Sequence, residues 1–372
     1  MNDDKLMAES KGAPEGGAVA ATEPQAASDV LLVDAYDYDL PAELIAQRPA
    51  EPRDASRLMV LDRRRPGLMH RTFRDIVDYL TPDDVLVLND TRVLPARLLG
   101  RKATGGKAEI LLLRPLSGNE WEALVRPSRR LRPGTEIAFD DPRLTVVIGE
   151  AVGEHTGTRR VALQCDGPLD EILDAVGRMP LPPYIHEEPE DPERYQTVFA
   201  HVPGSAAAPT AGLHFTPELL TRIRELGTKI VHVTLHVGLD TFRPVTAKYV
   251  TEHVIHREAY SVSAEAAVVI NEARAKGGRC IAVGTTTCRT LESAAAEDGT
   301  VQPQTAETGL FIYPGYRFRV VDALVTNFHL PRSSLLMLVA AFAGKERIMS
   351  AYAEAVRHRY RFFSFGDAML LL

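Results

Sequence analysis

Cysteine is scarce in this sequence, and a long hydrophobic run is missing from it. Three cysteines occur among 372 residues: Cys165, Cys280 and Cys288. Because their number is odd and they lie far apart in the sequence, they predict neither a disulfide framework nor a zinc site. No apolar stretch approaches the length of a membrane span. The segment 1–33 has neither the basic start nor the apolar core of a signal peptide, so we expect a disordered tail there and a cytoplasmic protein without membrane contact.

The common enzyme signatures are also missing. The sequence contains no G-x-S-x-G elbow, no Walker loop and no G-x-G-x-x-G after a strand. His232 and His236 are four residues apart, but on a strand this spacing separates them by roughly 13 Å, which is too far to share a metal ion. His253 and His256 have no third ligand near them in the sequence. We therefore expect no metal site.

Residues 95–168 differ in character from the rest of the chain. Short strand candidates at 108–113, 121–125, 136–139, 144–148 and 160–163 are separated by glycine and proline, and no helical period appears between them. On either side, helices and strands alternate. A chain of 372 residues is longer than a single hydrophobic core usually supports, so we expect two domains. We predict an α/β fold in which a catalytic domain (34–94 and 169–372) carries an inserted small antiparallel β-barrel domain (95–168).

The net charge of −7 hides a basic region between Arg92 and Arg132. Within it, Arg126, Arg129, Arg130 and Arg132 surround a turn that proline and glycine make stiff, so several guanidiniums are presented together. A phosphate backbone would bind such a surface. The alternative is a solvated face that balances acidic segments elsewhere.

A loop of small residues leads into a helix near the middle of the chain. It comprises Pro209, Thr210, Ala211, Gly212, Leu213, His214 and Phe215. Thr216 then supplies an N-cap hydroxyl, Pro217 suits the first helical position, and Glu218 meets the positive end of the helix dipole. Because this loop has little side-chain bulk, we expect a ligand to approach its backbone closely.

Three strand ends are expected near that loop. The alternating strand 229–237 delivers His236 and Gly238, and the apolar strand 280–283 is followed by Gly284, Thr285 and Thr286 at a helix start that also carries Arg289. A third strand ends at Asn327 and His329. Ligands of open α/β sheets bind beyond the carboxyl ends of the strands, and free amides at a helix start form an anion site. Plain N-capping by threonine is the alternative for 284–287.

Several segments, in order, resemble a known family. They are 88–93, 121–127, 195–200, 208–216, 234–238, 283–286, 289–293, 311–316, 321–331 and 365–369, and they are similar to the S-adenosylmethionine:tRNA ribosyltransferase-isomerases of queuosine biosynthesis. The resemblance runs from about Asp34 to the C-terminus. It implies a transferase that moves and isomerises the ribosyl moiety of S-adenosylmethionine onto 7-aminomethyl-7-deazaguanine at the tRNA wobble position. The product is epoxyqueuosine, and adenine and methionine are released.

The resemblance also implies roles for individual residues. S-adenosylmethionine is consumed as a substrate, so we expect no cofactor; the other partner is the tRNA anticodon loop, and we expect a monomer. His214, His236 and His329 are the candidates for catalytic base or acid, because histidine suits proton abstraction beside the sulfonium. The predicted substrate-binding residues are Asp90, Arg92, Pro209, Thr210, Ala211, Gly212, Phe215, Gly238, Gly284, Thr285, Thr286, Arg289 and Asn327, and the predicted tRNA-binding residues are Arg126, Arg129, Arg130 and Arg132.

Three positions depart from the family pattern. Asp240 stands where glycine is usual, Ala259 where tryptophan is expected, and Cys288 where an apolar residue is common. A specialised paralogue acting on another RNA or a free nucleoside is therefore an alternative. Two other classes also remain open: an RNA-binding protein would not need the small-residue loop, and a nucleoside hydrolase would act without tRNA.

Overall fold

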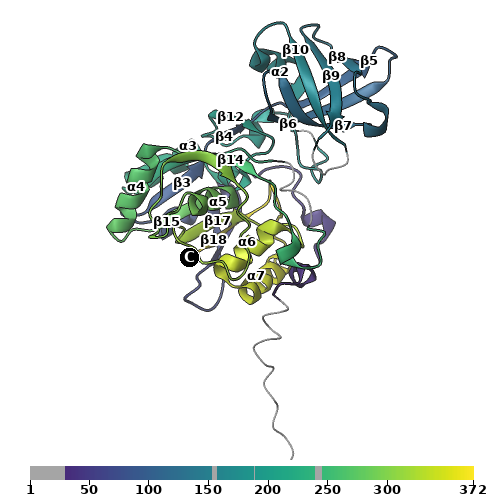
Figure 1. Ribbon diagram of the computed structural model, residues 1–372. Helices are drawn as coiled ribbons and strands as arrows, with labels where there is room; N and C mark the ends of the chain where they lie inside the picture. Colours follow the sequence, from purple (N-terminus) through teal and green to yellow (C-terminus); the bar gives the residue numbers. More distant parts are fainter. Residues whose placement is uncertain (1–29, 153–156, 188, 239–244) are drawn as a thin grey trace, which may run out of the picture.

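The computed structural model describes residues 30–152, 157–187, 189–238 and 245–372, which form an α/β body and a barrel lobe (Figure 1). The body is built on a nine-stranded sheet. In spatial order its strands are β16 (Gln304–Thr308), β14 (Glu258–Val262), β13 (Lys229–Leu235), β3 (Val85–Asn89), β15 (Cys280–Val283), β17 (Ala323–Asn327), β18 (Ala368–Leu371), β1 (Arg57–Leu61) and β2 (Met69–Thr72). The central strands β13, β3, β15 and β17 are parallel, so their carboxyl ends share one edge.

Both faces of this sheet are buried, and β3 shows why. Val85 and Val87 face one hydrophobic cluster, while Leu86 and Leu88 face the other. The first cluster includes residues of α4 (Ala264–Ala275), α5 (Thr285–Ser293), α6 (Ser334–Ala343) and α7 (Lys345–Arg357); the second includes residues of η4 (Phe73–Tyr79) and α3 (Pro217–Glu225). When successive side chains of a strand point alternately into two apolar clusters, all of them are hydrophobic, and the sequence of the strand is a continuous apolar run, as it is at 85–88.

The barrel prediction is confirmed. Six antiparallel strands close on themselves in the order β5 (Arg97–Lys102), β6 (Lys107–Pro115), β7 (Glu120–Arg126), β10 (Thr158–Cys165), β9 (Leu144–Ala151) and β8 (Glu136–Ala138). The sequence pattern does not indicate β5, because Gly100 interrupts its apolar alternation. That glycine is needed where the barrel closes: a Cβ there would lie 2.5 Å from the Ile137 side chain.

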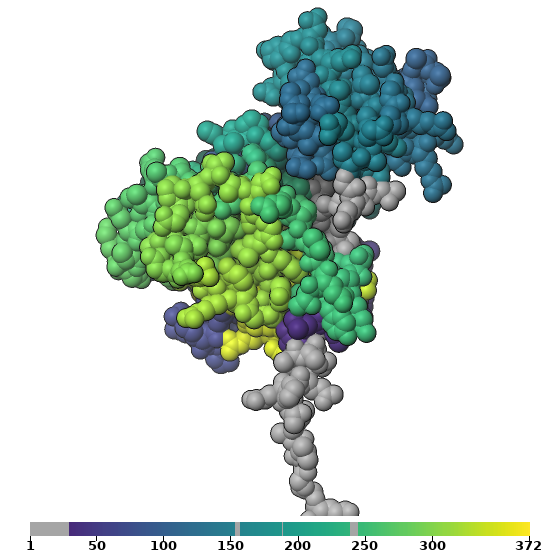
Figure 2. Space-filling view, in the orientation of Figure 1, coloured from purple at the N-terminus to yellow at the C-terminus, as the bar shows by residue number. Residues whose placement is uncertain are grey.

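The barrel lobe extends past the predicted boundary at residue 168. Helix α2 (Leu169–Val176) contributes Ile172 and Leu173 to the barrel core, and β11 (Gly177–Arg178) pairs with β5. The boundary was placed too early because the amphipathic period of α2 resembles the helices of the body. In the space-filling view the barrel stands as a lobe of its own above the body (Figure 2). Strands β4 (Thr91–Val93) and β12 (Val202–Ser205), a parallel pair, lie between the two (Figure 1).

The predicted tail, residues 1–33, lies outside the described residues as far as residue 29. Its last residues belong to the folded body: Leu32 bridges to Tyr249, and Val33 is buried at the start of η1 (Val33–Tyr36). The remaining short 3₁₀ helices are η2 (Ala42–Leu44), η3 (Arg53–Ala55), η5 (Ser128–Arg130), η6 (Pro192–Tyr195), η7 (Thr210–His214) and η9 (Val250–Glu252). Across the part of the chain that is described, no helix has the length and apolarity needed to cross a membrane.

Candidate functional site

A cavity of about 60 Å³ lies beyond the carboxyl ends of the parallel strands. The loop of small residues, the start of α5 and the end of β17 meet there, as the sequence predicts. The lining residues are Tyr184, Ala208, Pro209, Thr210, Ala211, Val237, Gly284, Thr285, Thr286, Thr326, Asn327, Phe328, His329, Leu330, Ser333, Leu335, Phe363 and Ser364. This is the place where open α/β sheets bind ligands.

The start of α5 brings backbone amides to this cavity. Gly284 is the N-cap, with φ of 93°, and no side chain caps the helix. The Thr287 hydroxyl instead donates to the Val283 carbonyl at 2.6 Å, so capping by threonine is not what these residues do. The side-chain amide of Asn89, at the end of β3, donates to the Leu235 carbonyl and to the Thr286 hydroxyl, which ties β13 to this helix start. Amides of the first turn are therefore available to an anion.

Asn327 connects the cavity to a buried polar network. Its Oδ1 accepts from the Thr210 hydroxyl at 3.0 Å, and its Nδ2 donates to the Phe363 carbonyl and to His214 Nε2, both at 3.1 Å. An amide nitrogen can only donate, so His214 Nε2 is an acceptor and Nδ1 carries the proton. That proton is directed to the Ser56 hydroxyl 2.7 Å away.

His214 is consequently a neutral, buried residue that uses both ring nitrogens within the protein. Its ring stacks on Phe73 at 4.9 Å between centroids, and it is not among the residues lining the cavity. Its pKa is lowered to about 4, chiefly by burial; the charge of Asp367 opposes this shift, and the charges of Arg361 and Arg53 add to it. These contacts are those of a structural histidine.

We expect the free energy of unfolding to fall between pH 7 and pH 5 in part because of His214. In the unfolded chain its pKa is near the ordinary value of 6.5, so the unfolded state binds a proton that the folded state, with a pKa of about 4, does not. Stability is therefore present above pH 6.5 and is lost as the pH falls towards 4. This one group accounts for a loss of about 2 kcal/mol between pH 7 and pH 5.

Urea unfolding of the wild type and of His214→Gln at the two pH values measures this effect. The variant, which has no titrating group at this position, is expected to lose about 2 kcal/mol less than the wild type over the same interval. An equal loss in both proteins would show that the pKa of His214 does not change on folding, which would contradict this prediction.

The other two candidate histidines differ in position. His329 lines the cavity; its Nε2 lies 2.7 Å from the Thr326 hydroxyl, and burial lowers its pKa to about 3. His236 does not line the cavity. Its Nδ1 lies 2.8 Å from the Thr91 hydroxyl, and its ring packs so closely on Gly204 that a Cβ there would be 2.8 Å away. Burial also lowers the pKa of His236, against the charge of Asp90.

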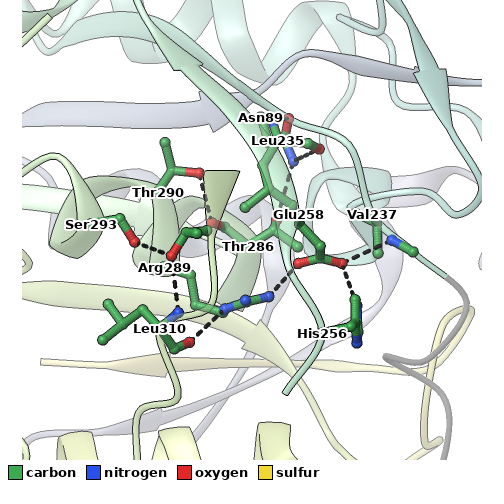
Figure 3. A network of polar contacts seen from close by, with 12 residues as sticks. Asn89, Leu235, Val237, His256, Glu258, Thr286, Arg289, Thr290, Ser293 and Leu310 are labelled. Atoms are coloured by element: carbon green, nitrogen blue, oxygen red, sulfur yellow. Dashed lines mark hydrogen bonds and ion pairs between the residues drawn. The ribbon is translucent and has the colours of Figure 1, made fainter. Parts of the chain in front are cut away.

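Arg289, predicted to bind substrate, is instead one half of a buried ion pair (Figure 3). Its Nη1 contacts Glu258 Oε2, its Nε donates to the Leu310 carbonyl, and side chains of both charged residues are at most 5 % exposed. Burial alone would raise the pKa of Glu258, but the hydrogen bond from His256 and the charge of Arg289 hold it below its usual range. Gly238 donates its amide to Glu258 Oε1, so it too belongs to this network.

The structure thus divides the predicted substrate-binding residues into two groups. Pro209, Thr210, Ala211, Gly284, Thr285, Thr286 and Asn327 line the cavity, whereas Asp90, Arg92, Gly212, Phe215, Gly238 and Arg289 do not. Asp90 accepts from the Thr234 hydroxyl, and Arg92 pairs with Glu193. Gly212 packs against Phe199, and Phe215 is fully buried against Phe73.

Several lining residues were not predicted. Tyr184, Phe363 and Ser364 come from segments without a periodic pattern, and the Tyr184 hydroxyl lies 2.8 Å from the Ser364 hydroxyl. Phe363 has a positive φ of 70°, which is an outlier for an aromatic residue. Proximity to the family-like segment 365–369 could have indicated Phe363 and Ser364, whereas no sequence signal pointed to Tyr184.

The four arginines predicted to bind tRNA are exposed on the barrel lobe around η5. Within the described chain, Arg126, Arg129, Arg130 and Arg132 form no ion pair, whereas other cations of the same region are neutralised: Arg97 by Glu109 and Arg114 by Glu122. Arg101, Lys102 and Lys107 of the same lobe also form no ion pair among the described residues, so the four arginines belong to a larger set of unpaired cations, and their contact with tRNA stays a prediction.

The departures from the family pattern lie in different surroundings. Cys288 is fully buried in α5, and burial raises its pKa well above the ordinary value, so its thiol is not an accessible nucleophile. Ala259 lies in β14 opposite Glu307 of β16. Asp240 lies outside the described residues.

Comparison with known proteins gives consistent results. A family model described as queuosine biosynthesis protein matches residues 33–371. The S-adenosylmethionine:tRNA ribosyltransferase-isomerase of Symbiobacterium thermophilum is 59 % identical over 339 residues, covering 91 % of this chain and 98 % of that protein. The protein of the same name from Acetivibrio thermocellus is 54 % identical over 342 residues, covering 92 % and 100 %. The crystal structure of an S-adenosylmethionine tRNA ribosyltransferase from Thermotoga maritima is 44 % identical, covers 91 % of this chain and 100 % of its own, and has a TM-score of 0.52.

Proposed function

Because this chain belongs to the queuosine biosynthesis protein family, we infer that it is an S-adenosylmethionine:tRNA ribosyltransferase-isomerase. It transfers and isomerises the ribosyl moiety of S-adenosylmethionine onto 7-aminomethyl-7-deazaguanine at the wobble position of tRNA. The product is epoxyqueuosine, and adenine and methionine leave. The observation that carries this function is the identity of 54–59 % with curated enzymes of that name over almost their whole length.

We propose that S-adenosylmethionine binds in the cavity at the strand ends. Its methionine carboxylate would accept hydrogen bonds from the first amides of α5 and from the Thr285 hydroxyl, because that helix end is positive and no side chain caps it. The cavity of about 60 Å³ is smaller than the several hundred Å³ of an ordinary ligand pocket. Binding must therefore move side chains at its wall, and Tyr184 and Phe363, whose rings lie 4.8 Å apart, are placed to do so.

We propose His329 as the proton-transfer residue among the three candidates, because it is the one that lines the cavity. The reaction removes a proton from the carbon beside the sulfonium and delivers a proton to the departing adenine. A ring with a pKa of about 3 is neutral at pH 7, so it offers a lone pair, and once protonated it is a strong acid towards a leaving group. His236 and His214 would then hold the surrounding loops.

Nucleoside mass analysis of substrate tRNA tests the overall function. Purified protein, S-adenosylmethionine and tRNA that carries 7-aminomethyl-7-deazaguanine are expected to yield epoxyqueuosine in the tRNA, with adenine and methionine released in equal amounts. Conversion of the free base or nucleoside without tRNA would favour the nucleoside-acting alternative. Tight tRNA binding without S-adenosylmethionine binding would favour a pure RNA-binding protein.

Reversing the charge of two barrel arginines is expected to weaken tRNA binding while sparing S-adenosylmethionine. Arg129→Glu combined with Arg130→Glu removes two cations that have no ion-pair partner among the described residues, so the affinity for tRNA and the slope of its salt dependence should both decrease. Filter binding at several salt concentrations measures this, and calorimetry measures S-adenosylmethionine. The matched control is Arg114→Glu, which removes a cation already paired with Glu122.

An equal loss of affinity for both ligands would contradict this assignment, because it would mean that the arginines support the pocket or the fold.

We also propose that the protein acts as a monomer in the cytoplasm without a cofactor. Light scattering of the pure protein with and without tRNA tests the monomer; a second subunit per tRNA would overturn it.

A further inference from the structure

Two histidines and a glutamate meet at the surface of the α/β body, outside the cavity. His70 comes from the edge strand β2, Glu354 from the last turn of α7, and His358 is the C-cap residue of that helix. Glu354 Oε1 lies 2.8 Å from His358 Nε2 and 3.7 Å from His70 Nε2. All three potential ligand atoms lie within 4.8 Å of one another. One carboxylate oxygen and two imidazole nitrogens therefore converge on a single point.

The surrounding contacts orient these three ligand atoms. His70 Nδ1 is 2.7 Å from the hydroxyl of the buried Tyr360, so the opposite nitrogen, Nε2, is the one directed at the cluster. The second oxygen of Glu354, Oε2, is held by Arg357. Ligating histidines commonly bond their other ring nitrogen to a fixed partner, and ligating carboxylates are also hydrogen-bonded. The cluster thus has the outer contacts of a metal site as well as its ligands.

We propose that His70, Glu354 and His358 bind one Zn²⁺ ion. Imidazole and carboxylate are ligands that suit Zn²⁺, and two histidines with one glutamate leave a fourth position for water. With Zn–N and Zn–O distances of about 2.0–2.2 Å, ligand atoms in a tetrahedron lie about 3.3 Å apart. The separations of 2.8 and 3.7 Å from Glu354 lie on either side of that value, and the two imidazole nitrogens lie within 4.8 Å of each other, so metal binding would draw the two exposed histidine side chains together.

The bound ion would join β2 to α7. Without it, the three residues join β2 to the end of α7 through one partly exposed pair, His70 with Glu354, and the ring contact of His70 with His358; an exposed pair contributes little to stability. The prediction of no metal site came from histidine pairs within single segments. Only Glu354 and His358, four residues apart on a helix, belong to one segment here; His70 reaches them through the fold of the sheet.

Calorimetric titration of the tag-free full chain with ZnCl₂ tests the proposal. The wild type is expected to saturate at one high-affinity Zn²⁺ ion per chain. His358→Ala and Glu354→Gln, both at the C-terminal end of α7, should weaken that binding at least tenfold, and Tyr360→Phe should weaken it by about 10- to 100-fold. The matched control is His186→Ala, which removes an exposed histidine far from the cluster in the sequence and should leave the titration unchanged.

Thermal unfolding supplies a second measurement. Zn²⁺ should raise the melting temperature of the wild type by a few degrees, EDTA should reverse the rise, and His358→Ala should show neither effect although its melting temperature without metal is unchanged. Absence of saturable binding in the wild type, or the same binding in His358→Ala and in the wild type, would overturn the site.

Discussion

Replacing His329 with alanine is expected to lower the turnover number by about a hundredfold or more, as loss of a general acid–base group does. Of the three candidate histidines, only this one lines the cavity where the substrate is proposed to bind. Its backbone is anchored independently of the ring, since its N–H donates to the Tyr352 hydroxyl at 2.9 Å and its carbonyl accepts from the Tyr38 hydroxyl. The truncated variant should therefore keep its loop and bind S-adenosylmethionine within a few-fold of the wild type. Single-turnover kinetics with saturating tRNA measures the chemical step.

His214→Ala is the matched control, because it also removes a buried histidine near Asn327 but leaves the cavity wall intact. Removing the His214 ring takes no group away from the cavity where the reaction is proposed to occur. It leaves the Ser56 hydroxyl and one Asn327 donor without their partner, which should lower the free energy of unfolding by about 2 kcal/mol or more. The folded fraction should react at a nearly normal rate. If His214→Ala instead slows the folded enzyme a hundredfold while His329→Ala does not, the roles of the two histidines are reversed.

Breaking the Glu258–Arg289 pair is expected to produce the largest loss of stability. Glu258→Ala leaves the Arg289 guanidinium buried at 5 % exposure without its counter-charge, which costs about 3–5 kcal/mol. Gly238 and His256 lose a hydrogen-bond acceptor in the same variant, so the end of β13 loses support near the cavity. Urea unfolding monitored by circular dichroism gives the change in the free energy of unfolding.

Two further variants isolate the cause. Glu307→Ala on the neighbouring strand β16 removes the partner of Arg257 from an exposed ion pair and should cost less than about 1 kcal/mol. The double variant Glu258→Leu with Arg289→Met removes both buried charges and should recover most of the lost stability. A double variant as unstable as Glu258→Ala would show that packing, rather than the unpaired charge, sets the cost.

Features of the fold that depend on neighbouring residues were predictable. Thr216 caps α3 by accepting from the Leu219 amide at 3.1 Å, which its place before Pro217 predicts. The alternation from Val231 to Leu235 predicted a strand with one buried face, and the apolar run 85–88 predicted a buried one. These signals are local, because a cap or a strand period is set by residues a few positions apart.

The candidate site was predictable as a region but not residue by residue. Parallel strands bring their carboxyl ends to one edge, so the positions of Gly284, Asn327 and the loop at 209–211 followed from the strand assignments. Arg289 shares a helix with Thr285, yet it faces Glu258 of β14 rather than the cavity. Nothing within four residues of Arg289 indicates that partner, because β14 is brought there by sheet pairing.

The sequence by itself determined the family, the α/β class with an inserted barrel, and the edge of the sheet where the candidate cavity lies. Only the tertiary structure decided which of several chemically equivalent side chains face that site. His214 and His329 carry the same ring and both follow from the same positional argument, but Asn327 and Ser56 occupy the two nitrogens of His214, while His329 reaches the cavity wall. Likewise, His70 meets Glu354 and His358 only after β2 is laid at the sheet edge beside α7. The reason is physical: residue type and period fix local conformation, whereas the partner of a side chain is fixed by contacts between segments far apart in the chain.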